Sequence, residues 1–406
     1  MAPNWLQAAA VAIFAATYIV IAIGKLPGFY LDRAGAALLG ASLMVGVGVL
    51  SLDEALRSID FDTIALLLGM MIVVGNLRLS GFFRLVNNWV VIRARHPLLL
   101  LAAVIVTSGF FSAFLVNDTI CLALTPLVLD LVIRLRRDPV PYLLAVAMAS
   151  NIGSVATLTG NPQNIMIGSF SRIAYGTFAA SLSPVAAIGL AVAFALIALF
   201  HRAEFRTRER LHGAPAPAHA YRPLAVKSAL VTLAMTAGFF AGLEPARLAL
   251  VAGSLLLVTR AVRSRKIYRE IDWPLLLMFI GLFIVVSGFE KAMLSPRIVA
   301  AIGRQHLDRM PVLAVATAVL SNLVSNVPAV LVLKPFVMAL PDPRRAWLVA
   351  AMAATLAGNL TLLGSVANLI VVQRAAERGV GIGFWQYFRV GAPVTVLTIL
   401  VGLWWL

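Results

Sequence analysis

The sequence is poor in cysteine and in charge, and each shortage excludes a class of protein. Its single cysteine, Cys121, excludes an intramolecular disulfide and any metal site built from cysteines alone. Only 12% of the 406 residues are charged and 61% are hydrophobic. A soluble domain is about 25% charged and about 45–50% apolar. The composition therefore excludes a soluble enzyme, a disordered chain and a disulfide scaffold, and it predicts a polytopic membrane protein.

Further absences narrow the function. The chain has no G-x-x-x-x-G-K-[ST] phosphate loop, so it is not by itself an ATP-driven pump. Its five histidines fall in predicted loop or interface segments, and no cluster of histidines or carboxylates has the spacing of a metal site. We therefore expect no enzyme, no catalytic residue, no metal and no cofactor. The net charge of +16 is spread between apolar runs, which favours basic membrane loops over binding of nucleic acid.

Long apolar segments run from end to end of the chain. They must be helical, because backbone exposed to lipid has to form its own hydrogen bonds. The segments are 4–24, 34–50, 62–77, 98–135, 141–178, 179–200, 224–241, 246–262, 273–289, 311–341, 345–376 and 387–406. Residues 1–24 lack the basic start of a signal peptide and are predicted to be a retained span. The long polar stretch 201–223 is predicted to be a basic cytoplasmic linker between two halves.

The two halves repeat each other. The matching pairs are RAGAALLGASLMV (33–45) with RLALVAGSLLLV (247–258), DTIALLLGMMIVV (62–74) with DWPLLLMFIGLFIVV (272–286), VNDTICLALTP (116–126) with SNVPAVLVLKP (325–335), and TLTGNPQN (157–164) with TLLGSVAN (361–368). Four matches in the same order, offset by about half the length, indicate an internal repeat. We predict an all-α polytopic fold with repeats at 1–200 and 224–406. The predicted hairpins are 98–135 and 311–341, and the predicted broken helices are 141–178 and 345–376.

The predicted topology inverts the second repeat. Five spans plus one hairpin that re-enters from its own side give an odd number of crossings in each half. With the linker in the cytoplasm, 23 of the 33 Lys and Arg fall on the cytoplasmic side and nine outside, which supports this orientation. We predict a multi-pass protein of the inner (plasma) membrane with both termini outside the cytoplasm. A hairpin that crosses fully has the same parity, so parity alone leaves re-entrance open.

Two segments beside the spans carry cations among aromatic and aliphatic residues. These segments, 81–97 and 291–305, are predicted to lie at the membrane interface as amphipathic arms, with ordinary polar loops as the alternative.

Polar residues concentrate at the hairpin tips and the helix breaks, where lipid makes them costly. Gly160, Pro162 and Gly364 can break helices near mid-membrane and free backbone carbonyls and amides. Asparagine recurs at matching places in both halves, which helix packing alone explains poorly. The predicted substrate-binding residues are Asn117, Asp118, Thr119, Asn151, Thr157, Asn164, Ser325, Asn326, Thr361 and Asn368.

Two charged residues lie within the hairpins at positions of interest. Asp118 is the only acidic residue at a hairpin tip and is predicted to couple transport to protons, with helix capping as the alternative. Lys334 is predicted to compensate charge, either in place of a sodium ion or by attracting an anion, with snorkelling as the alternative. Cys121 is predicted to be a buried small hydrophobe rather than an arsenic ligand. Asp130 is predicted to pair with Arg134, four residues on.

These motifs resemble the ion transporter superfamily, which contains the divalent anion/sodium symporters, the NhaD-type sodium/proton antiporters and the ArsB arsenite efflux permeases. AFLVNDTICLALTPLVL (113–129) and LVSNVPAVLVL (323–333) look most like the hairpins of the ArsB/NhaD branch. SNIGSVATLTGNPQN (150–164) resembles the superfamily's broken helix with its Gly-x-Pro-x-Asn pattern. Neither tip has the Ser-Asn-Thr of the dicarboxylate branch. The resemblance covers nearly the whole chain.

The resemblance implies a secondary transporter that carries a small inorganic or organic solute across the lipid bilayer. The first interpretation is proton-coupled efflux of arsenite or antimonite by alternating access, because the predicted centre has no arginine for a dicarboxylate. The alternatives are a proton- or sodium-coupled transporter of a small anion and a cation/proton antiporter. The proton motive force would drive transport, and the resemblance also admits a bound sodium ion. An ArsB-like chain could associate with a cytoplasmic ATPase subunit, and oligomers are compatible with it.

Overall fold

A computed structural model describes residues 4–24, 28–206, 211, 220–293 and 307–406. The regular elements of these residues are helices, which confirms the all-α prediction. They are α1 (Asn4–Ile23), α2 (Arg33–Gly46), α3 (Leu52–Ser58), α4 (Phe61–Leu79), α5 (Phe82–Arg93), α6 (Pro97–Phe114), α7 (Asn117–Arg134), α8 (Pro139–Ser154), η1 (Leu158–Gly160), α9 (Pro162–Ser171), α10 (Tyr175–Phe200), α11 (Arg202–Phe205), α12 (Arg222–Phe240), α13 (Pro245–Leu257), α14 (Ser264–Tyr268), α15 (Trp273–Met293), α17 (Met310–Val324), α18 (Asn326–Met338), α19 (Pro343–Ala357), α20 (Val366–Ala376) and α21 (Phe384–Trp405).

Within the described residues, seven helices are long and apolar enough to cross a membrane by length and composition. They are α1, α4, α6, α10, α12, α15 and α21. Shorter apolar helices, α2, α13, α17, α18 and α20, correspond to the predicted segments 34–50, 246–262, 311–341 and 345–376. The predicted segment 141–178 contains α8, η1 and α9. The number of long helices is thus smaller than the number of predicted segments, because α2, α13 and most helices of the hairpins and broken helices are shorter than 18 residues.

Most predicted boundaries lie close to the observed ones, and one differs. The predicted broken helix 141–178 ends earlier, at Ser171, because Arg172 adopts a left-handed conformation with φ 52° and closes the helix. A separate long helix, α10, then begins at Tyr175. The predicted arm at 81–97 contains α5, whereas most of the arm at 291–305 lies outside the described residues. Residues 207–210 and 212–219 of the predicted linker 201–223 also lie outside them.

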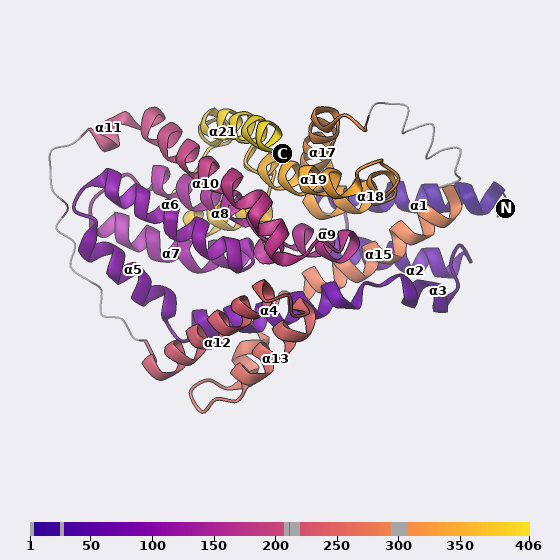
Figure 1. Ribbon diagram of the computed structural model, residues 1–406, viewed down its shortest axis with the longest axis horizontal. Coiled ribbons are helices and arrows are strands. Elements are labelled where there is room, and N and C mark those ends of the chain that lie inside the picture. The colour runs from indigo at the N-terminus through magenta and orange to yellow at the C-terminus, as the bar shows by residue number, and fades with distance from the viewer. Residues whose placement is uncertain (1–3, 25–27, 207–210, 212–219, 294–306) are drawn as a thin grey trace.

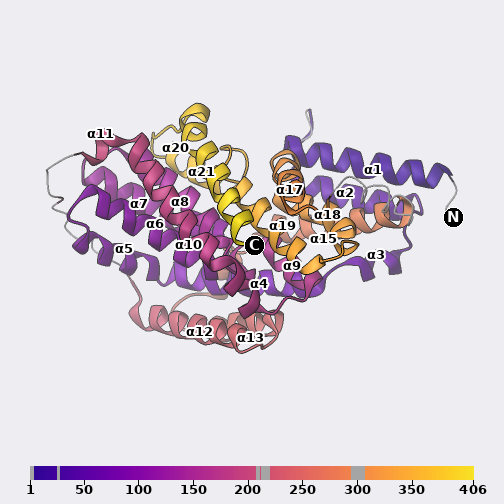
Figure 2. The ribbon, with the colours of Figure 1, turned by 45° about the horizontal axis from the view of Figure 1, so that its top comes forward.

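The helices form two outer groups around a central bundle (Figure 1). In one outer group α1 and α2 pack against α15, and in the other α12 and α13 pack against α4. Figure 2 shows α12 and α13 lying together along α4, on one side of the central bundle. The hairpins and broken helices, α6–α9 and α17–α20, pack against one another in the centre with α10 and α21. Each outer group therefore combines two helices of one half with one helix of the other.

The closest helix crossings in the two outer groups have the same sequence pattern. A Cβ atom on Gly69 of α4 would fall within the backbone of Ala249 on α13. A Cβ atom on Gly281 of α15 would fall within the backbone of Ala37 on α2. Both pairs of equivalent residues lie 212 positions apart in the sequence. Glycine is required at both crossings because only a residue without a side chain lets the two backbones approach this closely.

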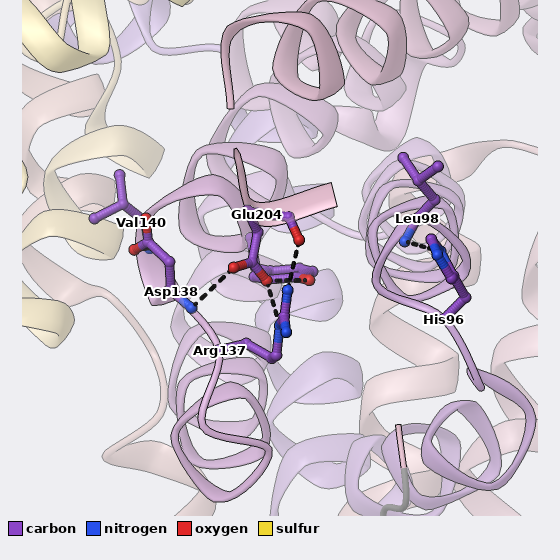
Figure 3. A network of polar contacts seen from close by, with 7 residues as sticks. His96, Leu98, Arg137, Asp138, Val140 and Glu204 are labelled. Carbon is purple, nitrogen blue, oxygen red and sulfur yellow. Dashed lines mark hydrogen bonds and ion pairs between the residues drawn. The ribbon is translucent and has the colours of Figure 1, made fainter. Parts of the chain in front are cut away.

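A partly buried ion pair fixes the turn between α7 and α8. Arg137 Nε donates to Glu204 Oε1 at 2.7 Å, and Arg137 Nη2 donates to the carbonyl oxygen of Glu204 at 2.5 Å. The hydroxyl of Tyr142 donates to the same carboxylate at 3.0 Å, and the backbone N–H of Asp138 donates to it at 3.4 Å. Figure 3 shows these contacts converging on Glu204. The network ties α11, and with it the start of the linker, to the central bundle.

Candidate functional site

Both hairpins turn at the predicted asparagines. α6 ends at Phe114 and α7 begins at Asn117, while α17 ends at Val324 and α18 begins at Asn326. Between α17 and α18, Ser325 has φ 77° and ψ 159°, a conformation that is essentially restricted to glycine. A serine held there is strained by about 1–3 kcal/mol, and such strain is concentrated at functional sites. The second tip is thus a strained turn, not a relaxed connection.

Each broken helix closes its break with an asparagine amide. Asn164 Nδ2 donates to the carbonyl oxygens of Ser154 and Thr157 at 3.1 and 3.0 Å. Asn368 Nδ2 donates to the carbonyl oxygens of Gly358 and Thr361 at 2.7 and 3.1 Å. Four backbone carbonyls at the two breaks are therefore already paired with amide N–H groups.

The glycines of the breaks allow this compact geometry. A Cβ atom on Gly160 would collide with the carbonyl oxygen of Ser154, and one on Gly364 would lie 3.0 Å from the carbonyl oxygen of Gly358. The second break runs from Gly358 to Ser365, between the end of α19 and the start of α20, and it contains no proline.

Asn151 of α8 joins the two halves at the centre. Its Nδ2 donates to Oδ1 of Asn359 at 2.9 Å and to Oδ1 of Asn368 at 3.0 Å. Its Oδ1 accepts from Asn117 Nδ2 and from Ser365 Oγ, both at 3.1 Å. All four contacts of this side chain are buried, and three of them reach the second half of the chain. Asn151 therefore links one hairpin tip to both ends of the opposite break.

A second set of contacts crosses between the halves in the opposite sense. Asn161 Nδ2 and Gln163 Nε2, at the start of α9, donate to Thr355 Oγ1 of α19 at 3.2 and 3.1 Å. Thr355 follows Asn151 by 204 residues, and Ser365 follows Asn161 by the same number. In each half, a side chain on the helix before the break therefore contacts the start of the helix after the break of the other half: Asn151 of α8 contacts Ser365 before α20, and Thr355 of α19 contacts Asn161 before α9.

A small cavity of about 40 Å³ lies between the two hairpin tips and the starts of α9 and α20. Its polar lining residues are Asn117, Asp118, Gln163, Ser325, Asn326 and Ser365. Its apolar lining comes from Leu275, Met278, Pro162, Val327 and Val366. Among the lining residues Asp118 alone is charged. A cavity needs about 10–15 Å³ of probe-occupied volume to hold a water molecule, so the site has room for small polar groups only.

Asp118 lies against the start of α20. The backbone N–H of Ala367, in the first turn of that helix, donates to Ser365 Oγ at 3.2 Å and also favours the ionised form of the Asp118 carboxylate. Helix N-termini stabilise negative charge, so the fold supplies one stabilising contact to the ionised form. The nearest other carboxylate that acts on Asp118 is that of Asp272, at the start of α15.

A larger pocket of about 250 Å³ adjoins the cavity. The two share Leu275, Met278, Ser325 and Val366 as lining residues, and the pocket extends to Arg33 and Asp272. A pocket of about 510 Å³ near Arg172 and Glu244 shares no lining residue with the cavity. The cavity thus adjoins the pocket near Arg33 and Asp272, and it shares no lining residue with the pocket near Arg172 and Glu244.

The predicted site residues occupy three kinds of position. Asn117, Asp118, Ser325 and Asn326 line the cavity, and Asn151, Asn164 and Asn368 form the buried network behind it. The structure does not place Thr119, Thr157, Thr361 or Lys334 in the lining. The Thr157 hydroxyl donates to the carbonyl oxygen of Ala113, so it holds the break against the hairpin. Lys334 Nζ lies 4.8 Å above the ring of Phe170, so this charge faces α9.

Two predictions beside the site have different outcomes. Cys121 is fully buried, as predicted for a small hydrophobe. The predicted pairing of Asp130 with Arg134 is wrong: Asp130 binds Arg378 of α20 at 2.6 Å, while Arg134 donates to the backbone oxygen of Asp130. The sequence spacing could not reveal Arg378, because that contact joins residues 248 positions apart.

Three residues of the site are missing from the predicted set. Gln163 and Ser365 line the cavity, and Asn359 accepts from Asn151. Their signal was available, because all three lie inside the polar stretches at the helix breaks. Choosing them over Thr157 and Thr361 required knowing which side of each break faces the opposite half.

The chain resembles known transporters over its whole length. It is 31% identical to an uncharacterized transporter of Mycobacterium tuberculosis (97% of this chain, 96% of the relative). It is 29% identical to the silicon efflux transporter LSI3 of Oryza sativa (96% and 95%) and 24% identical to the putative transporter arsB of Dictyostelium discoideum (92% and 87%). The crystal structure of the Alcanivorax borkumensis YdaH transporter has the same fold with a TM-score of 0.58, 16% identity and coverage of 98% and 96%.

A family model described as "Citrate transporter" matches residues 18–344. This range contains the first half from residue 18 onward, the second hairpin and the start of α19. The match and the relatives confirm the resemblance to the ion transporter superfamily and the prediction of a transporter instead of an enzyme. The chain belongs to the CitMHS citrate transporter family and is a multi-pass secondary transporter of the membrane.

Proposed function

We propose that the chain exports a small neutral hydroxide, with arsenite or antimonite as the first candidate, in exchange for protons. The observation that carries this proposal is the composition of the central cavity. It offers amides, hydroxyls and a single carboxylate, and none of its lining residues is basic. Arsenous acid is uncharged at neutral pH, so hydrogen bonds rather than a cationic side chain would recognise it. Asparagine amides and serine hydroxyls supply both donors and acceptors for such a solute.

The hydrogen bonds to the backbone carbonyls at the two helix breaks indicate which ion is coupled to transport. A sodium ion is held by oxygen ligands, and broken membrane helices supply them as backbone carbonyls. Here Asn164 and Asn368 already donate to two carbonyls in each break. Each of these carbonyl oxygens therefore has one of its two lone pairs in use, which leaves less of its acceptor capacity for a sodium ion. This favours a proton on Asp118 over sodium as the coupling ion.

The proposed cycle uses one site and one carboxylate. The cavity adjoins the pocket near Arg33 and Asp272, which the charge distribution predicts to face the cytoplasm. Substrate enters there and binds between the tips, and its binding favours release of the Asp118 proton to the cytoplasm. The hairpins and broken helices then move against the two outer groups, opening the cavity to the other side. After substrate leaves, Asp118 takes up an outside proton and the carrier returns.

The inverted arrangement of the two repeats is part of this proposal. The equivalent crossings at Gly69 and Gly281 and the reciprocal contacts of Asn151 and Thr355 support it. Two copies of one unit, related by inversion, would let the same contacts form on either side in turn.

Two relatives favour a neutral hydroxide. The names silicon efflux transporter and arsB attach to proteins that share 29% and 24% identity with this chain. Silicic acid and arsenous acid are both small, uncharged and rich in hydroxyl groups at neutral pH. A site that binds one by hydrogen bonds is chemically suited to the other, so silicic acid is the second substrate to test.

A small organic anion is the second candidate function, because the family model is described as a citrate transporter. Such a substrate carries several carboxylates, which proteins usually bind with arginine. The cavity has no arginine in its lining and a volume of about 40 Å³, so the geometry disfavours citrate in the described conformation.

Everted membrane vesicles test the substrate directly. With an inside-acid pH gradient, vesicles carrying the protein should accumulate arsenite, antimonite or silicic acid above vesicles without it, and a protonophore should abolish the accumulation. Sodium should have no effect. Accumulation of citrate but of none of the three hydroxides would contradict the proposed substrate class, and accumulation that requires sodium would contradict the proposed coupling.

A further inference from the structure

A second polar pocket lies away from the central cavity. It has a volume of about 480 Å³, within the range of about 300–1,000 Å³ typical of ligand sites. Four helices contribute to it: α4, α5, α7 and α20. Its charged lining residues are Arg78, Arg84, Arg374, Arg378, Asp130 and Glu377. The pocket shares no lining residue with the central cavity, and the proposed transport cycle does not use it.

The pocket carries more positive than negative charge. Arg378 pairs with Asp130 at 2.6 Å, Arg374 with Glu377 at 2.9 Å, and Arg78 with Glu270 at 2.8 Å. The carboxylates therefore neutralise three arginines. Arg84 has no ion-pair partner among the residues that the structure describes, and its side chain is exposed. One guanidinium with five N–H donors is left to face the pocket.

The position of Arg84 in the fold indicates whether a ligand would reach the pocket from the lipid or from solution. Arg84 lies in the first turn of α5, and the later residues Trp89 and Ile92 of this helix are 56% and 57% exposed. Arg93 lies 4.2 Å from the ring of Trp89. A helix with exposed aromatic and aliphatic side chains beside arginines is typical of the membrane interface. The pocket opening is thus at the level where lipid headgroups lie.

We propose that this pocket binds the phosphate headgroup of an anionic phospholipid, with Arg84 as the principal contact and Arg374 and Arg378 beside it. Arginine suits phosphate because its planar N–H fork donates two hydrogen bonds to the oxygens. Basic pockets between membrane helices on the cytoplasmic side bind such headgroups. The bound headgroup bridges α5 to α20, and so joins the first half of the chain to the broken helix of the second.

The test compares two exposed arginines, one inside the pocket and one outside it. Full-length protein is reconstituted in nanodiscs of phosphatidylcholine with increasing phosphatidylglycerol, and retained phosphatidylglycerol is counted by native mass spectrometry. Arg84→Gln should weaken retention more than tenfold, as expected when a hydrogen bond to a charged group is lost. Arg265→Gln removes the same charge from exposed α14, outside the pocket, and should weaken retention about fivefold or less. Arg374→Gln serves as a second pocket variant if Arg84→Gln is not monodisperse.

Equal effects of Arg84→Gln and Arg265→Gln would overturn the proposal, because they would indicate attraction by net charge alone. A second experiment distinguishes a lipid headgroup from free phosphate: inorganic phosphate is added to the protein in pure phosphatidylcholine nanodiscs. It should not raise the thermal unfolding midpoint of the wild type. Stabilisation by free phosphate that Arg84→Gln abolishes would overturn the lipid source and assign the pocket to a soluble anion. Neither readout depends on the transported substrate.

Discussion

Replacing Asn151 with alanine should separate the two halves of the central network. Asn151 makes four buried side-chain hydrogen bonds, to Asn117, Asn359, Ser365 and Asn368. Hydrogen bonds between membrane helices average about 0.6 kcal/mol in double-mutant cycles, so the four together contribute about 2 kcal/mol. Leaving buried partners unsatisfied adds to this, at about 1–3 kcal/mol for each group that finds no new partner. We expect a loss of about 2–4 kcal/mol in the free energy of unfolding.

Asn76→Ala is the matched control for this experiment. Asn76 is also fully buried, but its amide donates only to the carbonyl oxygen of Ile72 in its own helix. Both substitutions delete the same atoms, so the cost of the cavity is similar and the difference reports the network. Unfolding by sodium dodecyl sulfate in mixed micelles, followed by tryptophan fluorescence, measures both. Equal losses for Asn151→Ala and Asn76→Ala would refute the interpretation of Asn151 as the link between the halves.

Three further predictions concern other parts of the fold. Ser325→Gly should stabilise the protein by about 1 kcal/mol in the same unfolding assay, because glycine relieves the backbone strain at φ 77°, and it should slow transport, because glycine makes the hairpin tip more flexible. An unchanged stability would show that the turn is not strained. Arg137→Gln should destabilise the protein by about 3 kcal/mol, because Glu204, whose side chain is 10% exposed, would keep its charge without a cationic partner. Arg137→Gln/Glu204→Gln should recover part of the loss, and a double variant as unstable as the single one would contradict this. The hydrogen bond from Lys291 lowers the pKa of Glu54 from 4.5 to about 2, so this carboxylate stabilises the fold above pH 4.5 and stabilises it less as the pH falls toward 2. The difference in unfolding midpoint between wild type and Lys291→Gln should be constant from pH 8 to 5 and shrink below pH 4. A difference that grows on acidification would contradict the pairing.

The sequence predicted the course of the chain well because membrane helices leave a strong signal. Long apolar runs, the glycines at the breaks and the asparagines at the tips each follow from a local physical requirement. Asn117 and Asn326 begin their helices where the sequence placed the hairpin turns. The end of the first broken helix was missed because a left-handed Arg172 gives no compositional signal.

Contacts between the halves could not be predicted from local patterns. Arg378 reaches Asp130, and Asn151 reaches Asn359, across more than 200 residues. Lys334 looked like a site residue because it is charged and lies within a hairpin, but its orientation toward Phe170 depends on how α9 packs. Recognising residue types that belong near a site was feasible, whereas assigning each side chain to one face of its helix required the packed structure.

The most direct test of the proposed function is proton flux through Asp118. Asp118 is the only charged residue lining the cavity, and asparagine keeps its shape while removing its exchangeable proton. Wild-type protein and Asp118→Asn are reconstituted in liposomes with a trapped pH indicator, and arsenite, antimonite or silicic acid is supplied on one side. We predict proton movement opposite to the substrate for the wild type and none for Asp118→Asn, which should still bind substrate and exchange it downhill. Equal proton flux from both proteins would contradict the account and remove Asp118 from the coupling mechanism.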